Sequence, residues 1–165
     1  MSGIDTRRMT HRHDGPLVVF LIGTTINKWS RPRQWWPTFA AMPGMLAELS
    51  KDPESGLLGY RLLLGRGGPT VVQYWESTDK LYAYASDPAA LHRPAWAAFN
   101  RRARAATGVV GIWHETFVVD RAESIYVGTP TIGLAAATES VPVGSRSDRA
   151  GQRLDAGRTR TAPAA

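Results

Sequence analysis

A histidine and a carboxylate stand side by side in a run that otherwise has the pattern of a buried strand. The run is VVGIWHETFVV, in which His114 and Glu115 lie among apolar, small and β-branched residues. Buried charge is costly unless it is paired or used. An imidazole changes its charge near neutral pH and serves as a general base, so His114 is the first candidate for a catalytic group.

Strand alternation points these two side chains in opposite directions. It places Trp113, Glu115 and Phe117 on one face, and Ile112, His114 and Thr116 on the other. The second face is suited to packing under helices, so we expect His114 to look into the space between sheet and helices. The alternative is a core histidine hydrogen-bonded to a backbone carbonyl or to a helix side chain. We expect Glu115 to pair with an arginine, for example Arg61 of a neighbouring strand.

Further candidates follow helical spacing between Pro88 and Thr107. His92, Trp96 and Asn100 share one stripe of a helix and could present an imidazole and an amide to the same pocket. We therefore take His92 as a second candidate base and Asn100 as a group that stabilises an enolate oxygen. The alternative is that His92 caps the first turn near Pro94 and Trp96 fills the core.

Aromatic residues are the candidates for substrate binding. The chain has six Trp, three of them clustered where the first helix should begin. Aromatic walls suit a flat, apolar ligand, although the same side chains can simply fill a core. The residues predicted to contact substrate are Trp35, Phe39, Trp75, Trp96 and Phe99.

No cofactor and no metal are predicted. The chain has no Cys, and the two histidines of HRH (11–13) have no third ligand nearby in the sequence. No nucleotide-binding fingerprint appears. Haem held by one axial histidine, His114 or His92, is the minority alternative.

Composition and charge narrow the partners. The net charge is +6, but the 144–165 tail holds five Arg and two Asp, and we expect it to be a disordered, solvated basic tail. Residues 1–14 are expected to be a flexible N-terminus, which leaves a nearly neutral domain over 15–143. The sequence therefore predicts no nucleic-acid partner. It has no apolar run near 20 residues and no signal-peptide core, so we expect no membrane association and a cytoplasmic location.

The elements that must position these residues follow the order βαββαβ. Strands are predicted at 16–26, at LLGYRLLLG and TVVQYWE on either side of the turn RGGP, and at the run that holds His114. Helices are predicted from Ser30, from Ser77, and from Pro88 to Thr107. This is the ferredoxin-like α+β arrangement with a four-stranded antiparallel sheet. A strap over 124–143 follows it. Several strands are apolar on both faces, which predicts a homodimer formed sheet to sheet.

Several ordered blocks also carry a family resemblance. VVFLIGTTINKW, FAAMPGMLAELSKDPESGLLGYR, VQYWES, AWAAFNRR, GIWHETF and IYVGTPTIGL together resemble a monooxygenase-like family of the dimeric α+β-barrel superfamily, over about residues 9–143. The resemblance implies the barrel fold and a small pocket between sheet and helices, and it supplies no catalytic residues. Two positions depart from the family pattern. Phe117 replaces an expected Tyr, which excludes a phenol there, and TPTIGL replaces Met-Pro-aromatic-Gly-Leu.

Two functions are compatible with these features. The first is a small monooxygenase without bound cofactor, acting on an apolar aromatic or polyketide-like molecule in secondary metabolism; a cyclase, isomerase or dehydratase could use the same groups. The second is a haem-binding or non-catalytic ligand-binding barrel. We expect the first, with His114 or His92 as the base.

Overall fold

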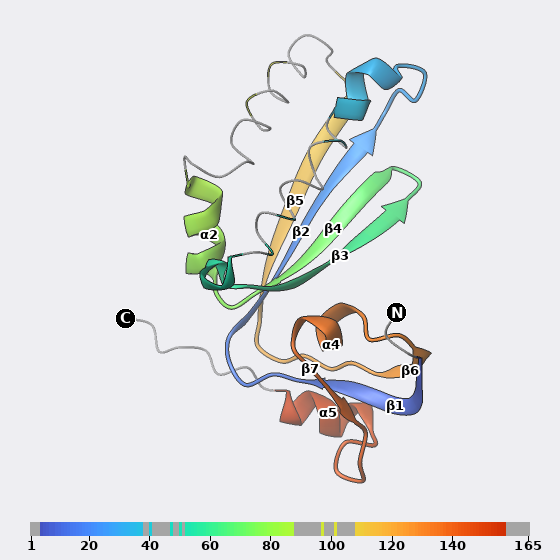
Figure 1. Ribbon diagram of the computed structural model, residues 1–165, viewed down its shortest axis with the longest axis vertical. Helices are drawn as coiled ribbons and strands as arrows, with labels where there is room; N and C mark the ends of the chain where they lie inside the picture. The colour runs from blue at the N-terminus through green and yellow to red at the C-terminus, as the bar shows by residue number, and fades with distance from the viewer. Residues whose placement is uncertain are drawn as a thin grey trace.

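The computed structural model describes residues 4–37, 40, 47, 50, 52–87, 97, 101 and 108–157. These residues form two β-sheets and several short helices (Figure 1). In chain order they are β1 (Asp5–Arg12), β2 (Leu17–Ile26), the 3₁₀ helix η1 (Pro53–Ser55), β3 (Leu57–Gly65), β4 (Gly68–Trp75), α2 (Thr78–Ser86), β5 (Val110–Val119), β6 (Tyr126–Thr129), α4 (Gly133–Ala137), β7 (Glu139–Pro142) and α5 (Ala150–Ala156). Residues 32–37 are also helical. Among all of these, no helix is long and apolar enough to cross a membrane.

The main sheet has the strand order β3-β4-β2-β5, and every neighbouring pair is antiparallel. Helical residues 32–37 follow β2, and α2 follows β4. The predicted turn RGGP is the tight connection between β3 and β4. The predicted ferredoxin-like α+β fold with a four-stranded antiparallel sheet is therefore confirmed.

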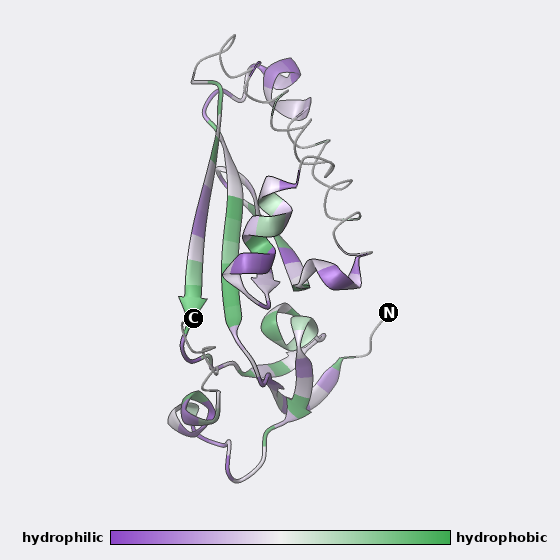
Figure 2. Ribbon diagram, turned by 90° about the vertical axis from the view of Figure 1, so that its left-hand side faces the viewer, coloured by the Kyte–Doolittle hydropathy of each residue, from purple (hydrophilic) through white to green (hydrophobic). Residues whose placement is uncertain are grey.

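One face of this sheet is covered by helices. Val18 lies opposite Trp75 in the sheet, and both pack with Leu81 of α2 in a buried cluster. Ser77 begins α2 as predicted, because its side chain accepts a hydrogen bond from the backbone N–H of Lys80 at 3.1 Å. Figure 2 shows the sheet from its edge, with α2 and helical residues 32–37 on the same side. We call this side the helix face.

Among the described residues, those of α4 cover part of the opposite face at one end. There α4 packs on β3 so closely that a Cβ on Gly59 would come within 2.8 Å of the Cβ of Ala137. On the same face, Phe117 lies at the opposite edge of the row that contains Gly59 and is 50% exposed, and Leu63, farther along β3, is 38% exposed. The predicted strap over 124–143 therefore covers one end of the face and leaves an apolar surface that the described residues do not cover.

A second sheet has the order β6-β1-β7, so the first strand of the chain lies at its centre. This corrects the expectation of a flexible segment over 1–14. Although β1 is rich in charge, its backbone pairs on both sides, and Thr10 is buried with its hydroxyl donating to the carbonyl of Ser124 at 2.7 Å. The pairing satisfies the backbone groups that a flexible segment would leave to water.

The expectation of a disordered tail over 144–165 is also wrong for its described part. Helix α5 lies within it, and the Arg153 side chain is 7% exposed. The Arg153 guanidinium donates to Glu123 Oε1 at 2.7 Å and to the carbonyls of Ser147 and Asp148 at 2.9 and 2.8 Å. A charge with this many partners can be buried, and it anchors α5 to the segment between β5 and β6 that holds Glu123.

Candidate functional site

His114 lies on the helix face of β5, an outer strand of the main sheet, directly opposite Ile22 of β2. Its imidazole is 5.7 Å from the ring of Phe20, measured between centroids. The side chain is exposed, and it makes no hydrogen bond to any described residue. The prediction that His114 faces the helices is confirmed. The alternative of a core histidine held by a hydrogen bond does not match this environment, which leaves both ring nitrogens open to a ligand.

Glu115 points to the opposite face, as predicted, but its expected pairing with Arg61 within one chain is wrong. Arg61 and Glu115 are the two ends of a row of residues that runs across the sheet. In this row Arg61 lies opposite Val72, Val72 opposite Leu21, and Leu21 opposite Glu115. Three strand spacings separate them by about 14 Å. Both side chains are exposed, and neither forms an ion pair with a described residue.

Trp75 lies on the helix face but at the bottom of the packed core. Its side chain is 0% exposed, its indole N–H donates to Gln73 Oε1 at 2.9 Å, and its ring lies 5.8 Å from that of Tyr84. These contacts favour the alternative in which Trp75 fills the core. Its role in substrate binding stays a prediction.

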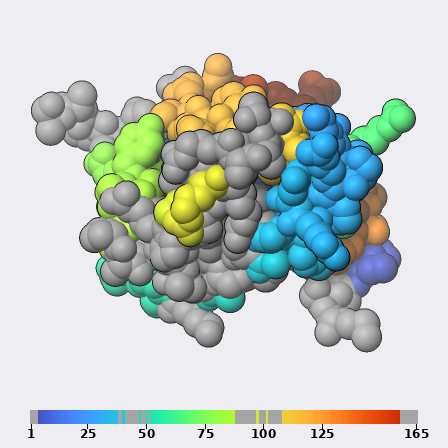
Figure 3. Space-filling view, turned by 90° about the horizontal axis from the view of Figure 1, so that it is seen from above, coloured from blue at the N-terminus to red at the C-terminus, as the bar shows by residue number. Residues whose placement is uncertain are grey.

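Trp35 belongs to an aromatic cluster just beyond the C-terminal end of β2. Its ring centroid lies 5.5 Å from that of Trp29 and 6.0 Å from that of Trp36, both in edge-to-face geometry. The backbone N–H of Asn27 donates to the carbonyl of Val109 at 2.9 Å and ties this segment to the start of β5. Figure 3, viewed from this end, shows the segment that follows β2 (blue) beside the start of β5 (gold). The cluster is therefore fixed to the same strand that carries His114.

Five predicted residues lie outside the described part of the chain. They are the candidate catalytic residues His92 and Asn100 and the candidate substrate contacts Phe39, Trp96 and Phe99. Their roles stay predictions.

Thr24 is a polar residue of the helix face that the sequence analysis did not single out. It lies in β2 opposite Ile112, two residues along β2 from Ile22, the residue opposite His114. Thr24 is 4% exposed, and its Oγ1 has no hydrogen-bond partner among the described residues. The available signal was the pair of threonines in an otherwise apolar strand.

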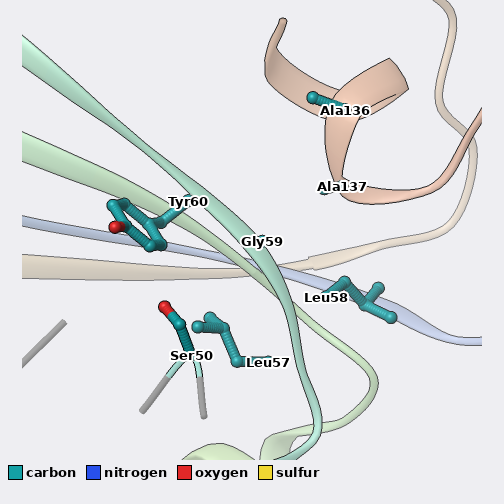
Figure 4. A pocket seen from close by; sticks show the side chains of 7 residues that line it. All are labelled: Ser50, Leu57, Leu58, Gly59, Tyr60, Ala136 and Ala137. Carbon is teal, nitrogen blue, oxygen red and sulfur yellow. The ribbon is translucent and has the colours of Figure 1, made fainter. Parts of the chain in front are cut away.

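Two of the cavities that the described residues form are lined by residues away from His114. One, of about 240 Å³, is formed by β3 and α4 with Ser50, and its lining is mostly apolar (Figure 4). It borders the opposite outer strand of the sheet, and of its lining only Tyr60 carries a titratable side chain. This cavity offers little for acid–base chemistry.

The other cavity, of about 210 Å³, lies between β1 and α5 and is lined by His11, His13 and Asp14 among others. His11 Nδ1 lies 2.8 Å from Ser124 Oγ, and His13 Nε2 lies 3.0 Å from the carbonyl of Pro16. Burial, and then the neighbouring His13, lower the pKa of His11, whereas Glu123 acts in the other direction. Among the described residues no three His, Cys, Asp or Glu side chains form a group that could hold a metal ion.

The phenol excluded at position 117 has a counterpart in the same row of the sheet. Tyr74 lies opposite Val19, which in turn lies opposite Phe117. Burial raises the pKa of Tyr74, and Tyr126 adds to this, while the positive charge of Arg61 lowers it. Tyr74 is therefore held in its neutral form on the face opposite His114.

A family model described as monooxygenase af470-like matches residues 17–134. The match begins at the first residue of β2 and includes the main sheet, α2 and β6. A search of the curated proteins found no match to the chain.

Solved structures with the same kind of fold share little sequence with this chain. A candidate antibiotic biosynthesis monooxygenase from Caulobacter crescentus CB15 is 17% identical, with 64% of this chain and 92% of that chain covered at a TM-score of 0.45. SnoaB, a cofactor-independent oxygenase from Streptomyces nogalater, is 18% identical. The match covers 64% of this chain and 94% of SnoaB at a TM-score of 0.38. A dimeric ferredoxin-like protein of unknown function from Jannaschia sp. CCS1 is 17% identical. The match covers 60% of this chain and 97% of that chain at a TM-score of 0.40. None is similar enough to transfer residue roles.

Proposed function

The chain belongs to the monooxygenase af470-like family, and from that premise we propose that it is a small oxygenase that works without a bound cofactor. Its substrate is an apolar aromatic molecule that carries an acidic C–H next to an oxygen-bearing ring. Its place in secondary metabolism and in the cytoplasm is part of the same proposal.

The reaction needs a base because dioxygen reacts slowly with closed-shell organic molecules. His114 removes a proton from a CH₂ group, and the negative charge spreads to the ring oxygen as an enolate. The carbanion passes one electron to dioxygen, and the resulting radical and superoxide combine to form a peroxide. The peroxide takes the proton back from His114. As the remaining C–H proton leaves, the O–O bond breaks and hydroxide departs, and the proton and the hydroxide combine to form water. The net change is CH₂ + O₂ → C=O + H₂O.

The environment of His114 is the observation that carries this proposal. The imidazole stands on the helix face beside the ring of Phe20, and no described residue hydrogen-bonds it. A base must reach the proton it removes, and an imidazole with neither ring nitrogen bonded to a described residue can offer either nitrogen to a substrate. Asn100 remains the proposed partner for the enolate oxygen, and His92 the alternative base.

Oxygen uptake by the purified full-length protein tests the proposal. Anthrone is a suitable probe because its CH₂ is acidic and its ketone lies on the same ring system. We expect one O₂ consumed per anthrone, no Soret absorption, and no loss of rate in the presence of EDTA. Uptake no faster than in buffer, or uptake that requires added haem or metal, would refute a cofactor-independent oxygenase. A Soret band without turnover would favour the haem-binding alternative.

The same proposal includes a homodimer formed through the face opposite the helices. Its support is the uncovered apolar surface around Phe117, and the row in which Arg61 and Glu115 mark opposite edges. A two-fold axis parallel to the strands and lying between two such faces reverses the order of the row. Each Arg61 then lies opposite the Glu115 of the second copy, with Val72 and Leu21 packed between the pairs.

A further inference from the structure

The buried hydroxyl of Thr24 lacks the partner that such a group normally has. Three buried side-chain atoms have no hydrogen-bond partner among the described residues: Thr24 Oγ1, Gln34 Oε1 and Thr129 Oγ1. By contrast Thr10, which is 5% exposed, donates to the Ser124 carbonyl at 2.7 Å. Leaving a buried hydroxyl unpaired lowers the stability of the free protein, so the orphan at Thr24 calls for a partner from outside the described chain.

The position of Thr24 connects this orphan to His114. The two residues are diagonal neighbours on β2 and β5 and share the helix face. Diagonal neighbours of this kind lie about 7–8 Å apart. The backbone of Gly68 packs closely against Thr24, because a Cβ at Gly68 would come within 2.6 Å of the Thr24 carbonyl oxygen and 3.0 Å of Thr24 Oγ1. An exposed imidazole and a buried, unpaired hydroxyl thus stand about one ring system apart on the same face of the sheet.

We infer that Thr24 Oγ1 is a substrate-binding group that hydrogen-bonds an oxygen of the aromatic molecule whose C–H lies against His114. This inference rests on the proposed function. The ligand class is an aromatic ketone or phenol with the oxygen and the acidic C–H on one ring system. Thr24 takes no part in proton transfer. It fixes the orientation of the ring, and the bond forms in the ground state as well as in the transition state.

Uniform binding of this kind predicts an effect on affinity and little effect on the chemical step. In Thr24→Val, which keeps the shape and removes the hydroxyl, we expect the Kd for anthrone and the KM to rise about tenfold and kcat to stay within about twofold. Thr24→Ser retains the hydroxyl and should bind within about twofold of the wild type. Thr25→Val makes the same change on the opposite face of β2 and should leave Kd and KM unchanged.

Two measurements keep this inference separate from the oxygenase proposal. Binding is followed without oxygen, by quenching of tryptophan fluorescence with anthrone, and turnover is followed by oxygen uptake. If the wild type binds anthrone and consumes no oxygen, the oxygenase proposal fails, while weaker binding by Thr24→Val still supports Thr24. If the wild type turns over anthrone and Thr24→Val has the same Kd and KM, the inference about Thr24 fails alone.

Thermal unfolding supplies a readout that needs no ligand. Because the hydroxyl has no partner in the free protein, Thr24→Val should melt at the wild-type temperature or above it. A melting temperature several degrees below the wild type would show that the hydroxyl is already bonded in the free protein and would overturn the inference. Failure of the wild-type protein to bind anthrone would overturn the ligand class.

Discussion

Replacing His114 with Gln should separate catalysis from stability. The substitution removes a ring contact with Phe20 and no hydrogen bond to any described residue. An aromatic pair contributes about 0.5–1.5 kcal/mol beyond its buried area, and the glutamine side chain retains part of the contact. We therefore expect the free energy of unfolding to fall by about 1 kcal/mol or less, which lowers the melting temperature of a domain of this size by about 2–4 °C.

Loss of a general base should have a much larger effect on turnover. Removing a positioned base slows a reaction by about 10²–10⁴-fold, equivalent to about 3–5 kcal/mol of activation free energy. Oxygen uptake with anthrone measures the rate, and calorimetry measures the unfolding. Thr116→Val, which alters a neighbour on the same face, is the matched control and should preserve both. If His114→Gln destabilises the protein by several kcal/mol or keeps full activity, His114 is not the base, and His92 with Asn100 becomes the next candidate.

Three further predictions concern the rest of the molecule. Deleting residues 144–165 should lower the melting temperature by at least about 4 °C, because the partly buried Glu123 loses its ion pair with Arg153. An unchanged melting temperature would mean that α5 contributes no stability. Arg61→Glu should weaken dimers in sedimentation experiments, and adding Glu115→Arg should restore them; equal association of single and double variants would rule out the proposed axis. His11 should make the fold acid-sensitive, because its pKa is lower in the folded protein than in the unfolded chain. As the pH falls below about 6.5, the unfolded chain binds the proton first, and the stability that the fold has above that pH is lost. His11→Gln should flatten this dependence in acid titrations followed by circular dichroism.

The main sheet was predictable because its signals are local. The strand Leu17–Ile26 is apolar apart from its two threonines, and the turn between β3 and β4 carries its own glycine signature. Alternation placed His114 on the same face as Ile112 and Thr116, and the suitability of that face for packing under helices assigned it to the helix side. Each of these inferences needs only a few consecutive residues.

The second sheet was missed because its stabilising contacts are distant in sequence. Strand β1 has the sequence DTRRMTHR, which offers little apolar area. Arg12 binds Glu139 through two hydrogen bonds of 2.7 and 2.6 Å, and Arg8 pairs with Asp148. Local composition predicts disorder for such a segment, because it does not reveal partners from the other end of the chain.

The candidate site was predictable only in part for the same reason. The exposure of His114 and the unpaired state of Thr24 Oγ1 depend on what other elements place around them. The proposed contact between Glu115 and Arg61 within one chain failed because strand order, not sequence distance, decides which residues are neighbours. The order β3-β4-β2-β5 puts these two residues at opposite edges.

The central place of β1 in the second sheet has a consequence for how the chain is made. Met9 pairs with Tyr126 on one side and with Pro142 on the other, so during synthesis β1 has no partner in this sheet until β6 has followed it. The main sheet, whose strands are all synthesised before β6, can form in the meantime. Closing so long a loop is slow, and during the wait an unpaired β1 offers both of its edges to other nascent chains. Three arginines against one aspartate give this strand a net positive charge, and the repulsion between like-charged strands disfavours pairing between nascent copies of β1 before its own partners are made.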